Sequence, residues 1–128
     1  MNTPLLLCYR IEEDICIELK KLAKPFGVSL RRVPPSAYEL PIGAVVAGME
    51  GKSSPLVPDL PEGMLVFANF PEVMLDAFLG GMKKRQIRVP LKAVITKHNA
   101  AWTAHTLYRE LLAEREAIQK KRGQNDER

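Results

Sequence analysis

The sequence predicts an α/β domain in which a βαβα unit occurs twice and the four strands form one mainly parallel sheet. Apolar runs without alternation, typical of strands buried on both faces, are followed along the chain by segments of helical periodicity. The segment LLCYRIEEDICIEL from Leu6 runs in step with LVFANFPEVMLDAF from Leu65. With a two-residue insertion in the second copy, LRRVPPSAYELPIGAVV from Leu30 also follows LKAVITKHNAAWTAHTL from Leu91.

The length of the chain limits the number of domains. It has 128 residues, of which 46% are hydrophobic, which is enough for one core and too little for two ordinary domains. We therefore expect a single domain over residues 1–122, made of two pseudo-repeats, 1–48 and 63–122. The proline-rich segment 49–62 shows no periodicity and is expected to link the repeats, and residues 123–128 are expected to form a disordered tail.

The first repeat reads as strand, helix, strand and helix. PLLLCYRI, residues 4–11, is expected to be a strand buried on both faces. A helix follows from about Glu12, because apolar residues recur there at every third or fourth position, and Gly27 fits its left-handed cap. VSLRRV, residues 28–33, is a weaker strand, and Ser36 is expected to cap a short irregular helix.

The second repeat has the same order of elements. MLVFANF, residues 64–70, is expected to be its buried strand. Asn69 and Glu72 have the spacing of a capping box before the next helix. VPLKAVIT, residues 89–96, is the fourth strand, and the last helix is expected over residues 100–121.

The order of the strands defines where a ligand would bind. Placing the first strand of each repeat at the centre gives the order 2-1-3-4, whereas a ferredoxin-like α+β sheet with mixed strand directions is the alternative that the linker allows. In open α/β sheets, ligands bind beyond the carboxyl ends of the strands, where the strand order reverses. The 2-1-3-4 arrangement therefore predicts a binding edge formed by Tyr9, Arg10 and Asn69 at the switch point, with Thr96, Lys97, His98 and Asn99 beside it.

The turn TKHNAAW at the start of the last helix also has a purely structural interpretation. Thr96 or Asn99 can cap that helix, and Trp102 can pack beneath the turn. We expect Asn99 to be the N-cap, which leaves Thr96, Lys97 and His98 as the exposed residues that a partner could contact.

The net charge of +4 is unevenly distributed. Residues 1–62 hold seven basic and eight acidic residues, whereas residues 63–128 hold twelve and seven. Such an excess of basic residues can attract phosphate or nucleic acid. The helix dipole also favours cations near the end of a helix, which is a purely structural explanation. No aromatic residues that could stack on bases lie among these cations. The excess is concentrated in a basic patch without intervening acids, which consists of Lys83, Lys84, Arg85, Arg88 and Lys92 and is followed by Lys97.

Several functional classes lack their sequence signatures. No run approaches the about 18 apolar residues of a membrane helix, and the N-terminus does not read as a signal peptide, so a cytoplasmic protein is expected. Cys8 and Cys16 are expected to be buried free thiols in a reducing compartment. His98 and His105 lack further ligands at metal-binding spacing, and no nucleophile elbow, Walker loop or dinucleotide fingerprint is present. We therefore expect no metal, no cofactor and no catalytic activity.

Two segments resemble a known family. LKAVITKHNAAW followed by LYRELLAERE resembles the C-terminal signature of the bacterial domain-of-unknown-function family 3783, and YELPIGAVVAG resembles its mid-chain segment. The resemblance covers nearly the whole chain outside the linker and tail, and its most specific part is Leu91 to Trp102. In that family a second threonine and a proline usually follow the first threonine of the turn, where this chain has Lys97 and His98. The family brings no established activity, so the resemblance implies architecture only.

Three functional hypotheses remain. The first is a noncatalytic binding or regulatory module that recognises a protein partner or a small anion. The alternative is a nucleic-acid-binding domain that uses the basic segment Lys83–Lys97, and a small enzyme is the third. The first two differ in their response to salt, because binding driven by phosphate contacts weakens steeply as the salt concentration rises.

Overall fold

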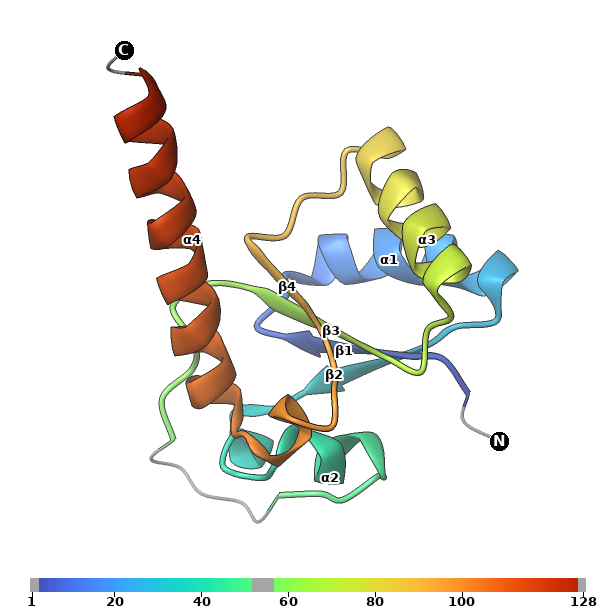
Figure 1. Ribbon diagram of the computed structural model, residues 1–128. Coiled ribbons are helices and arrows are strands. Elements are labelled where there is room, and N and C mark those ends of the chain that lie inside the picture. Colours follow the sequence, from blue (N-terminus) through green and yellow to red (C-terminus); the bar gives the residue numbers. More distant parts are fainter. Residues whose placement is uncertain (1–2, 52–56, 127–128) are drawn as a thin grey trace.

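The structure is a computed structural model that describes residues 3–51 and 57–126 (Figure 1). Its centre is one four-stranded sheet with the strand order β2-β1-β3-β4, which confirms the predicted order 2-1-3-4. The strands are short and the two central ones are buried along their whole length, as their unbroken apolar sequences predicted. Their bounds are Leu5–Tyr9 for β1, Ser29–Val33 for β2, Met64–Ala68 for β3 and Leu91–Val94 for β4.

The directions of the strands differ between the two repeats. β1 and β2 are parallel, and so are β3 and β4, but β1 and β3 are antiparallel. The sheet is therefore mainly parallel, as predicted, and its central pairing has the mixed direction that the alternative arrangement allowed. As a consequence, the second repeat runs through the sheet in the opposite direction to the first.

The central pairing relates the two repeats symmetrically. Leu7 of β1 lies opposite Val66 of β3, and these residues are equivalent in the repeat that begins at Leu6 and Leu65. A twofold relation between the repeats therefore passes through this pair.

The predicted alignment of β2 with β4, the second strands of the two repeats, is wrong by one residue. Ser29 lies 24 positions after its partner Leu5, and Leu91 lies 27 positions after its partner Met64, so the insertion is three residues rather than two. The difference of one residue reverses the face of the strand. Leu30 accordingly packs on one face of the sheet and Leu91 on the other.

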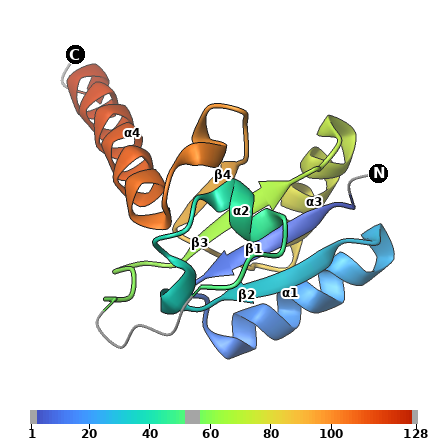
Figure 2. The ribbon, with the colours of Figure 1, turned by 90° about the horizontal axis from the view of Figure 1, so that it is seen from below.

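Helices cover both faces of the sheet (Figure 2). α1 (Glu13–Phe26) and α3 (Glu72–Lys84) share one buried cluster with the strands. α2 (Ile42–Val46) and the first turns of α4 (Ala104–Asp126) share the other. The later turns of α4 extend away from the sheet in both views (Figures 1 and 2). No helix in residues 3–51 and 57–126 is both long and apolar enough to cross a bilayer.

The first helix has the predicted ends. α1 ends at Gly27, which adopts the left-handed conformation with φ of 69°.

The contact between α1 and α3 explains one of the two adjacent glycines in α3. A Cβ atom at Gly81 would lie 2.7 Å from the Cδ1 atom of Leu22, so this glycine allows the two helices to approach closely. Gly80 has no neighbouring atom within 4 Å of such a Cβ position, so its side chain position is open.

Three predicted caps are wrong. Ser36 lies inside a 3-10 turn, η1 (Pro35–Ala37), and α2 begins later, after Pro41. α3 begins after Pro71, which holds the N-cap position and has no side-chain acceptor, and the amide of Asn69 donates to the carbonyl of Thr3. Asn99 begins a separate 3-10 turn, η2 (Asn99–Ala101), which Trp102 and Thr103 separate from α4.

The N-terminus of α4 is capped by Thr103. Its Oγ1 atom accepts a hydrogen bond of 3.3 Å from the backbone N–H of Thr106, and its carbonyl accepts one of 3.1 Å from Leu107. The helix continues to Asp126, so residues 123–126, which we expected in a disordered tail, are helical. Residues 127 and 128 lie outside the described residues.

The segment 49–62 does more than join the repeats. Leu60 is buried in the cluster beneath α2 and α4. Asp59 accepts a hydrogen bond of 2.6 Å from the hydroxyl of Tyr38, and Glu62 accepts hydrogen bonds from Tyr108 and Arg115 of α4. The end of the segment therefore connects the end of η1 to α4, whereas residues 52–56 lie outside the described residues.

Candidate functional site

The antiparallel central pairing separates the residues that we expected at the switch point. Because β1 and β3 run in opposite directions, their carboxyl ends lie at opposite ends of the sheet. Tyr9 and Arg10 therefore lie at one end, and Asn69 lies at the other, where its side-chain nitrogen is 3.4 Å from the carbonyl oxygen of Thr3. The predicted combination of Tyr9, Arg10 and Asn69 in one site is wrong.

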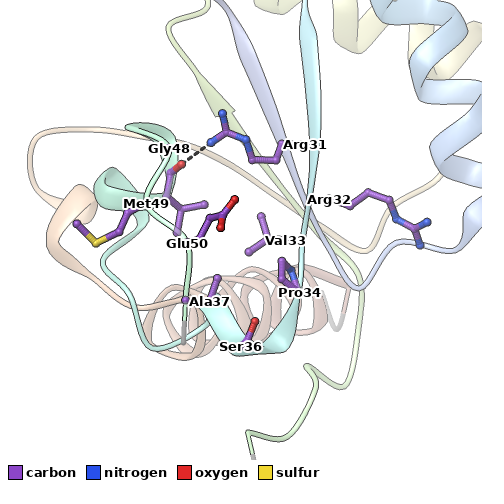
Figure 3. A pocket seen from close by; sticks show the side chains of 11 residues that line it. Arg31, Arg32, Val33, Pro34, Ser36, Ala37, Gly48, Met49 and Glu50 are labelled. Atoms are coloured by element: carbon purple, nitrogen blue, oxygen red, sulfur yellow. Dashed lines mark hydrogen bonds between the residues drawn. The ribbon is translucent and has the colours of Figure 1, made fainter. Parts of the chain in front are cut away.

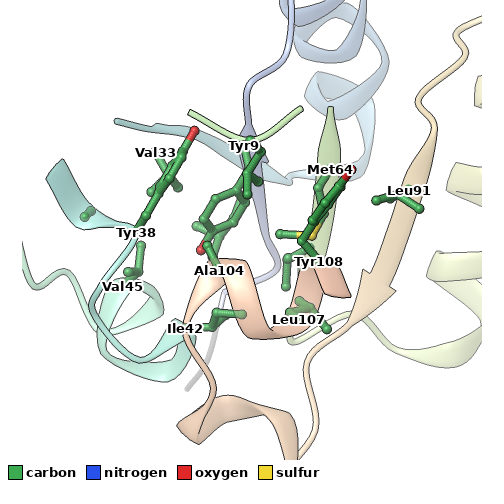
Figure 4. Close-up of a cluster of buried hydrophobic side chains, with 14 of the residues drawn as sticks. Tyr9, Val33, Tyr38, Ile42, Val45, Met64, Leu91, Ala104, Leu107 and Tyr108 are labelled. Atoms are coloured by element: carbon green, nitrogen blue, oxygen red, sulfur yellow. The ribbon is translucent and has the colours of Figure 1, made fainter. Parts of the chain in front are cut away.

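Tyr9 belongs to the core. Its side chain is fully buried, and among the described residues its hydroxyl has no hydrogen-bond partner. Figure 4 shows that this hydroxyl points toward Ala104 of α4, in the opposite direction to the hydroxyl of Tyr38. Burial raises the pKa of Tyr9 above its ordinary value of 10.0. This residue is therefore not exposed to a ligand in solution.

Arg10 lies beside a residue of the basic patch. It directly follows β1 in the left-handed conformation, with φ of 53°, and its side chain is exposed. Arg10 and Arg88 line the same hollow of about 220 Å³, together with Glu12 and Glu62. The antiparallel pairing causes this proximity, because it places the carboxyl end of β1 next to the segment that enters β4.

The turn from Thr96 to Asn99 is held by its own polar groups. The backbone N–H of Thr96 donates to Oδ1 of Asn99 at 2.7 Å, and the N–H of Asn99 donates to Oγ1 of Thr96 at 3.1 Å. The side-chain nitrogen of Asn99 also donates to the carbonyl of Val94 at 3.0 Å. These bonds account for the turn structurally, with Lys97 and His98 exposed.

Trp102 packs beneath this turn. Its side chain is partly buried against the cluster of α2 and α4, and its ring lies edge-on to that of His98 with centroids 5.2 Å apart. Its carbonyl accepts a hydrogen bond of 2.9 Å from the N–H of Ile42 at the start of α2. Trp102 therefore joins the turn to α2.

The fold separates Lys97 from the basic patch. Lys83 and Lys84 lie in the last turn of α3, and Arg85 and Arg88 line one hollow together with Asp14 and Glu18 of α1. Lys97 lies beyond the opposite end of β4 from Arg88. Lys97 is therefore set apart, whereas Arg88 shares one hollow with Arg85 and another with Lys83 and Lys92.

Three members of the patch converge on one hollow. Lys83, Arg88 and Lys92 line a space of about 560 Å³ between the end of α3 and β4. None of the described residues that line it is acidic. The remaining lining residues are Gln86 and the apolar Leu79, Met82, Ile87 and Val89. We call this space the basic hollow.

Backbone hydrogen bonds satisfy the end of α3 beneath the basic hollow. The carbonyls of Met82 and Lys83 accept bonds of 2.9 Å and 3.1 Å from the N–H groups of Ile87 and Gln86. The Nζ atom of Lys92 lies 3.3 Å from the carbonyl oxygen of Val89. A lysine has three N–H donors, so Lys92 retains two that can bind a ligand.

A second large hollow, beside the edge strand β2, has a different charge (Figure 3). It measures about 480 Å³, and its Arg31 guanidinium donates a hydrogen bond to the carbonyl of Val45. Glu50 also lines it, while the side chain of Arg32 points away from it in Figure 3. Its one inward cation is therefore bound to the backbone and lies near an acid, so the basic hollow is better suited to an anion.

Sequence reasoning identified the cations of the basic hollow but missed Gln86. The sequence contained a signal for this residue. The segment KKRQIR at the end of the predicted helix lacks the glycine that commonly terminates a helix. Gln86 takes the left-handed conformation that such a glycine would adopt, with φ of 58°. Among residues 3–51 and 57–126, no three His, Cys, Asp or Glu side chains gather where they could hold a metal ion.

Comparison with known proteins concerns the second repeat. Neither a curated protein nor a solved structure matches the chain. The mid-chain segment YELPIGAVVAG, which we also compared with the family, lies outside the one matched region. Residues 63–118, which include β3, α3, β4 and the whole basic hollow, match the family described as Domain of unknown function (DUF3783), and this confirms the resemblance that the segment from Leu91 to Trp102 indicated.

Proposed function

We propose that the protein is a noncatalytic binding module that takes a small organic anion in the basic hollow. The observation that carries this proposal is the convergence of Lys83, Arg88 and Lys92 on a space without an acidic residue. Cations of this kind bind carboxylate or phosphate groups through charge-assisted hydrogen bonds. The ligand would therefore carry at least one such group.

The apolar lining defines the rest of the ligand. Ile87 and Val89 are buried, with 8% and 5% of their surfaces exposed, and they form an apolar floor together with Leu79 and Met82. The volume of about 560 Å³ falls within the range of small-molecule sites. An aromatic or aliphatic body that bears a phosphate or a carboxylate matches both the charge and the floor.

The lining of the basic hollow supports binding rather than catalysis. Among the described residues, its walls hold no carboxylate, histidine, cysteine, serine or threonine, the usual general bases and nucleophiles. The two lysines and the arginine are suited to holding charge.

A nucleic acid is the alternative ligand, and it needs a longer cationic surface. Asp14 and Glu18 line a hollow with both Arg85 and Arg88 and interrupt the cationic surface there, and Lys97 lies beyond the far end of β4. The basic hollow has no aromatic residue in its lining on which a base could stack. These features favour a compact anion, and an acidic segment of a protein partner would use the same cations.

The test is a binding titration with 1-naphthyl phosphate, a fluorescent dianion with an apolar body, and neutral 1-naphthol for comparison. Replacing Lys83, Arg88 and Lys92 with glutamine is expected to weaken binding of the phosphate by at least about tenfold. The matched control replaces Lys20, Lys24 and Lys120, three exposed lysines elsewhere, with glutamine. It changes the net charge equally and should leave the affinity within about twofold of the parent.

Each other outcome has a defined meaning. Equal losses in the two triple variants would indicate unspecific charge attraction, and failure of the parent to bind would refute the proposal. Tighter binding of a single-stranded oligonucleotide, lost in the first triple variant and steeply reduced by salt, would support the nucleic-acid alternative.

We further propose that the protein acts in the bacterial cytoplasm. Cys8 and Cys16 are both free and buried, as expected of thiols in a reducing compartment. Residues 63–118 match the family that the sequence resembles, and that resemblance implies a bacterial protein.

A further inference from the structure

We infer that Gln86 determines the specificity of the basic hollow, by donating a hydrogen bond from its side-chain amide to the bound anion. This inference rests on the proposed function and concerns a residue that the charge pattern did not indicate. Gln86 is exposed and lines the basic hollow beside Lys83, Arg88 and Lys92. Its amide would be the one uncharged polar side chain among these cations.

The backbone at Gln86 is unfavourable for a glutamine. The residue follows the last turn of α3 with φ of 58°, a conformation that glycine adopts without steric conflict. Side chains with a Cβ atom are disfavoured there, with asparagine and aspartate the most tolerant. The presence of a long amide side chain at this position therefore requires an explanation outside the local backbone.

The first repeat provides an internal comparison. Gly27 holds the equivalent position at the end of α1, with φ of 69°. Its N–H bonds to the carbonyl of Lys24 at 3.1 Å, as that of Gln86 bonds to Lys83 at 3.1 Å. The following residue also forms an equivalent bond in both repeats. The N–H of Val28 donates to the carbonyl of Ala23, and the N–H of Ile87 donates to the carbonyl of Met82.

The same helix end is therefore built with glycine in one repeat and glutamine in the other. Glycine fulfils the structural requirement at Gly27, where an added Cβ would meet no atom within 4 Å. Space alone thus does not explain the difference. The two positions differ in their surroundings, since Gln86 lines the basic hollow and also the hollow with Asp14 and Glu18, whereas Gly27 lines neither.

The amide is chemically suited to this role. It offers two N–H donors that can join the cations around a phosphate or carboxylate, and it adds no charge. Its geometry is directional, whereas a lysine ammonium binds as a point charge. A hydrogen bond from Gln86 would therefore fix the orientation of an anion that the three cations attract.

Three variants test the inference with the 1-naphthyl phosphate titration and thermal melting. Gln86→Gly removes the amide and relieves the backbone, so it should raise Tm by about 3 °C and weaken binding by about tenfold. Gln86→Glu keeps the size and backbone conformation but repels the anion, so it should weaken binding further while Tm stays close to that of the parent. Asn69→Gly is the matched control, because Asn69 has φ of 63° at the opposite end of the sheet, and it should leave binding unchanged.

The outcomes separate this inference from the proposed function. If Gln86→Gly binds the probe like the parent while the Lys83, Arg88 and Lys92 triple variant does not, the inference is wrong and the anion site stands. If Asn69→Gly weakens binding as much as Gln86→Gly, the effect is a general consequence of loop glycine and the inference also fails. If the parent itself does not bind the probe, the proposed function and this inference are both refuted.

Discussion

The rings of Tyr9 and Tyr38 lie 5.7 Å apart in one buried cluster, but their hydroxyl groups have opposite environments. The hydroxyl of Tyr38 donates a 2.6 Å hydrogen bond to Asp59, while that of Tyr9 has no partner among the described residues. A buried polar group without a partner lowers stability, whereas a hydrogen bond to a charged group raises it. The two tyrosines should therefore respond oppositely to removal of the hydroxyl.

Tyr9→Phe is expected to leave the free energy of unfolding unchanged or to raise it by about 1 kcal/mol. Tyr38→Phe is expected to lower it by about 1–3 kcal/mol, because the carboxylate of Asp59 loses the hydroxyl donor and keeps only the N–H of Leu60. Urea unfolding of both variants measures the difference. A loss of stability in Tyr9→Phe as large as that in Tyr38→Phe would show that the Tyr9 hydroxyl is satisfied.

Alkaline pH is expected to destabilise the protein. Burial raises the pKa of Tyr9, and burial together with the hydrogen bond to Asp59 raises that of Tyr38, both from an ordinary value of 10.0. Burial and the neighbouring Cys16 raise the pKa of Cys8 above 9.0. The fold therefore favours the protonated forms, so their contribution is complete below the unfolded pKa values and declines as the pH rises past about 9 to 10.

Thermal melts between pH 7 and pH 11 measure this decline. Tyr9→Phe removes one of the three groups, so the Tm of this variant should fall less steeply above about pH 10 than that of the parent. Cys8→Ser is not a suitable control, since it places a hydroxyl in the apolar cluster beneath α1 and α3. Identical alkaline slopes for the parent and Tyr9→Phe would contradict the role of Tyr9.

The two adjacent glycines of α3 form a matched pair. Gly80→Ala should raise the free energy of unfolding by about 1 kcal/mol, because alanine favours the helix and no atom lies within 4 Å of the new methyl group. Gly81→Ala should gain less or be destabilising, since its methyl group would lie 2.7 Å from Leu22 Cδ1. Equal stabilisation by both changes, measured by urea unfolding, would show that the contact between α1 and α3 yields easily.

Thr103 is expected to contribute more than Asn99 to the start of α4. Thr103→Ala removes the side-chain acceptor of the Thr106 N–H and should lower the free energy of unfolding by about 1 kcal/mol. Thr103→Ser retains the hydroxyl and should restore most of this loss. A neutral Thr103→Ala together with a loss of α4 helicity in Asn99→Ala, followed by circular dichroism, would instead return the capping role to Asn99.

Gly27, the left-handed residue at the end of α1, allows the stability effect of a glutamine in this conformation to be measured separately from binding. Gly27→Gln introduces into the first repeat the residue found at position 86 of the second. It should lower the free energy of unfolding by about 1 kcal/mol, because a Cβ atom is disfavoured at φ of 69°. A variant as stable as the parent would show that this helix end accepts glutamine without cost.

Much of the architecture followed from local features of the sequence. The apolar runs of β1 and β3 predicted buried central strands, the periodicity of residues 12–26 predicted α1, and Gly27 predicted its end. The repeat between the segments from Leu6 and Leu65 predicted the strand order β2-β1-β3-β4. These features depend on burial and backbone conformation within a few residues, so the sequence contains them directly.

The tertiary structure alone decided the direction of β3 against β1, and with it the composition of the candidate site. An apolar strand buried on both faces fits a parallel or an antiparallel neighbour equally well, so the hydrophobic pattern contains no information on direction. The antiparallel choice moved Asn69 to the far end of the sheet and brought Arg10 beside Arg88. The folded contacts also separated Lys97 from Lys83, Arg88 and Lys92, because charges that are neighbours in sequence meet in space only where the chain turns back between α3 and β4.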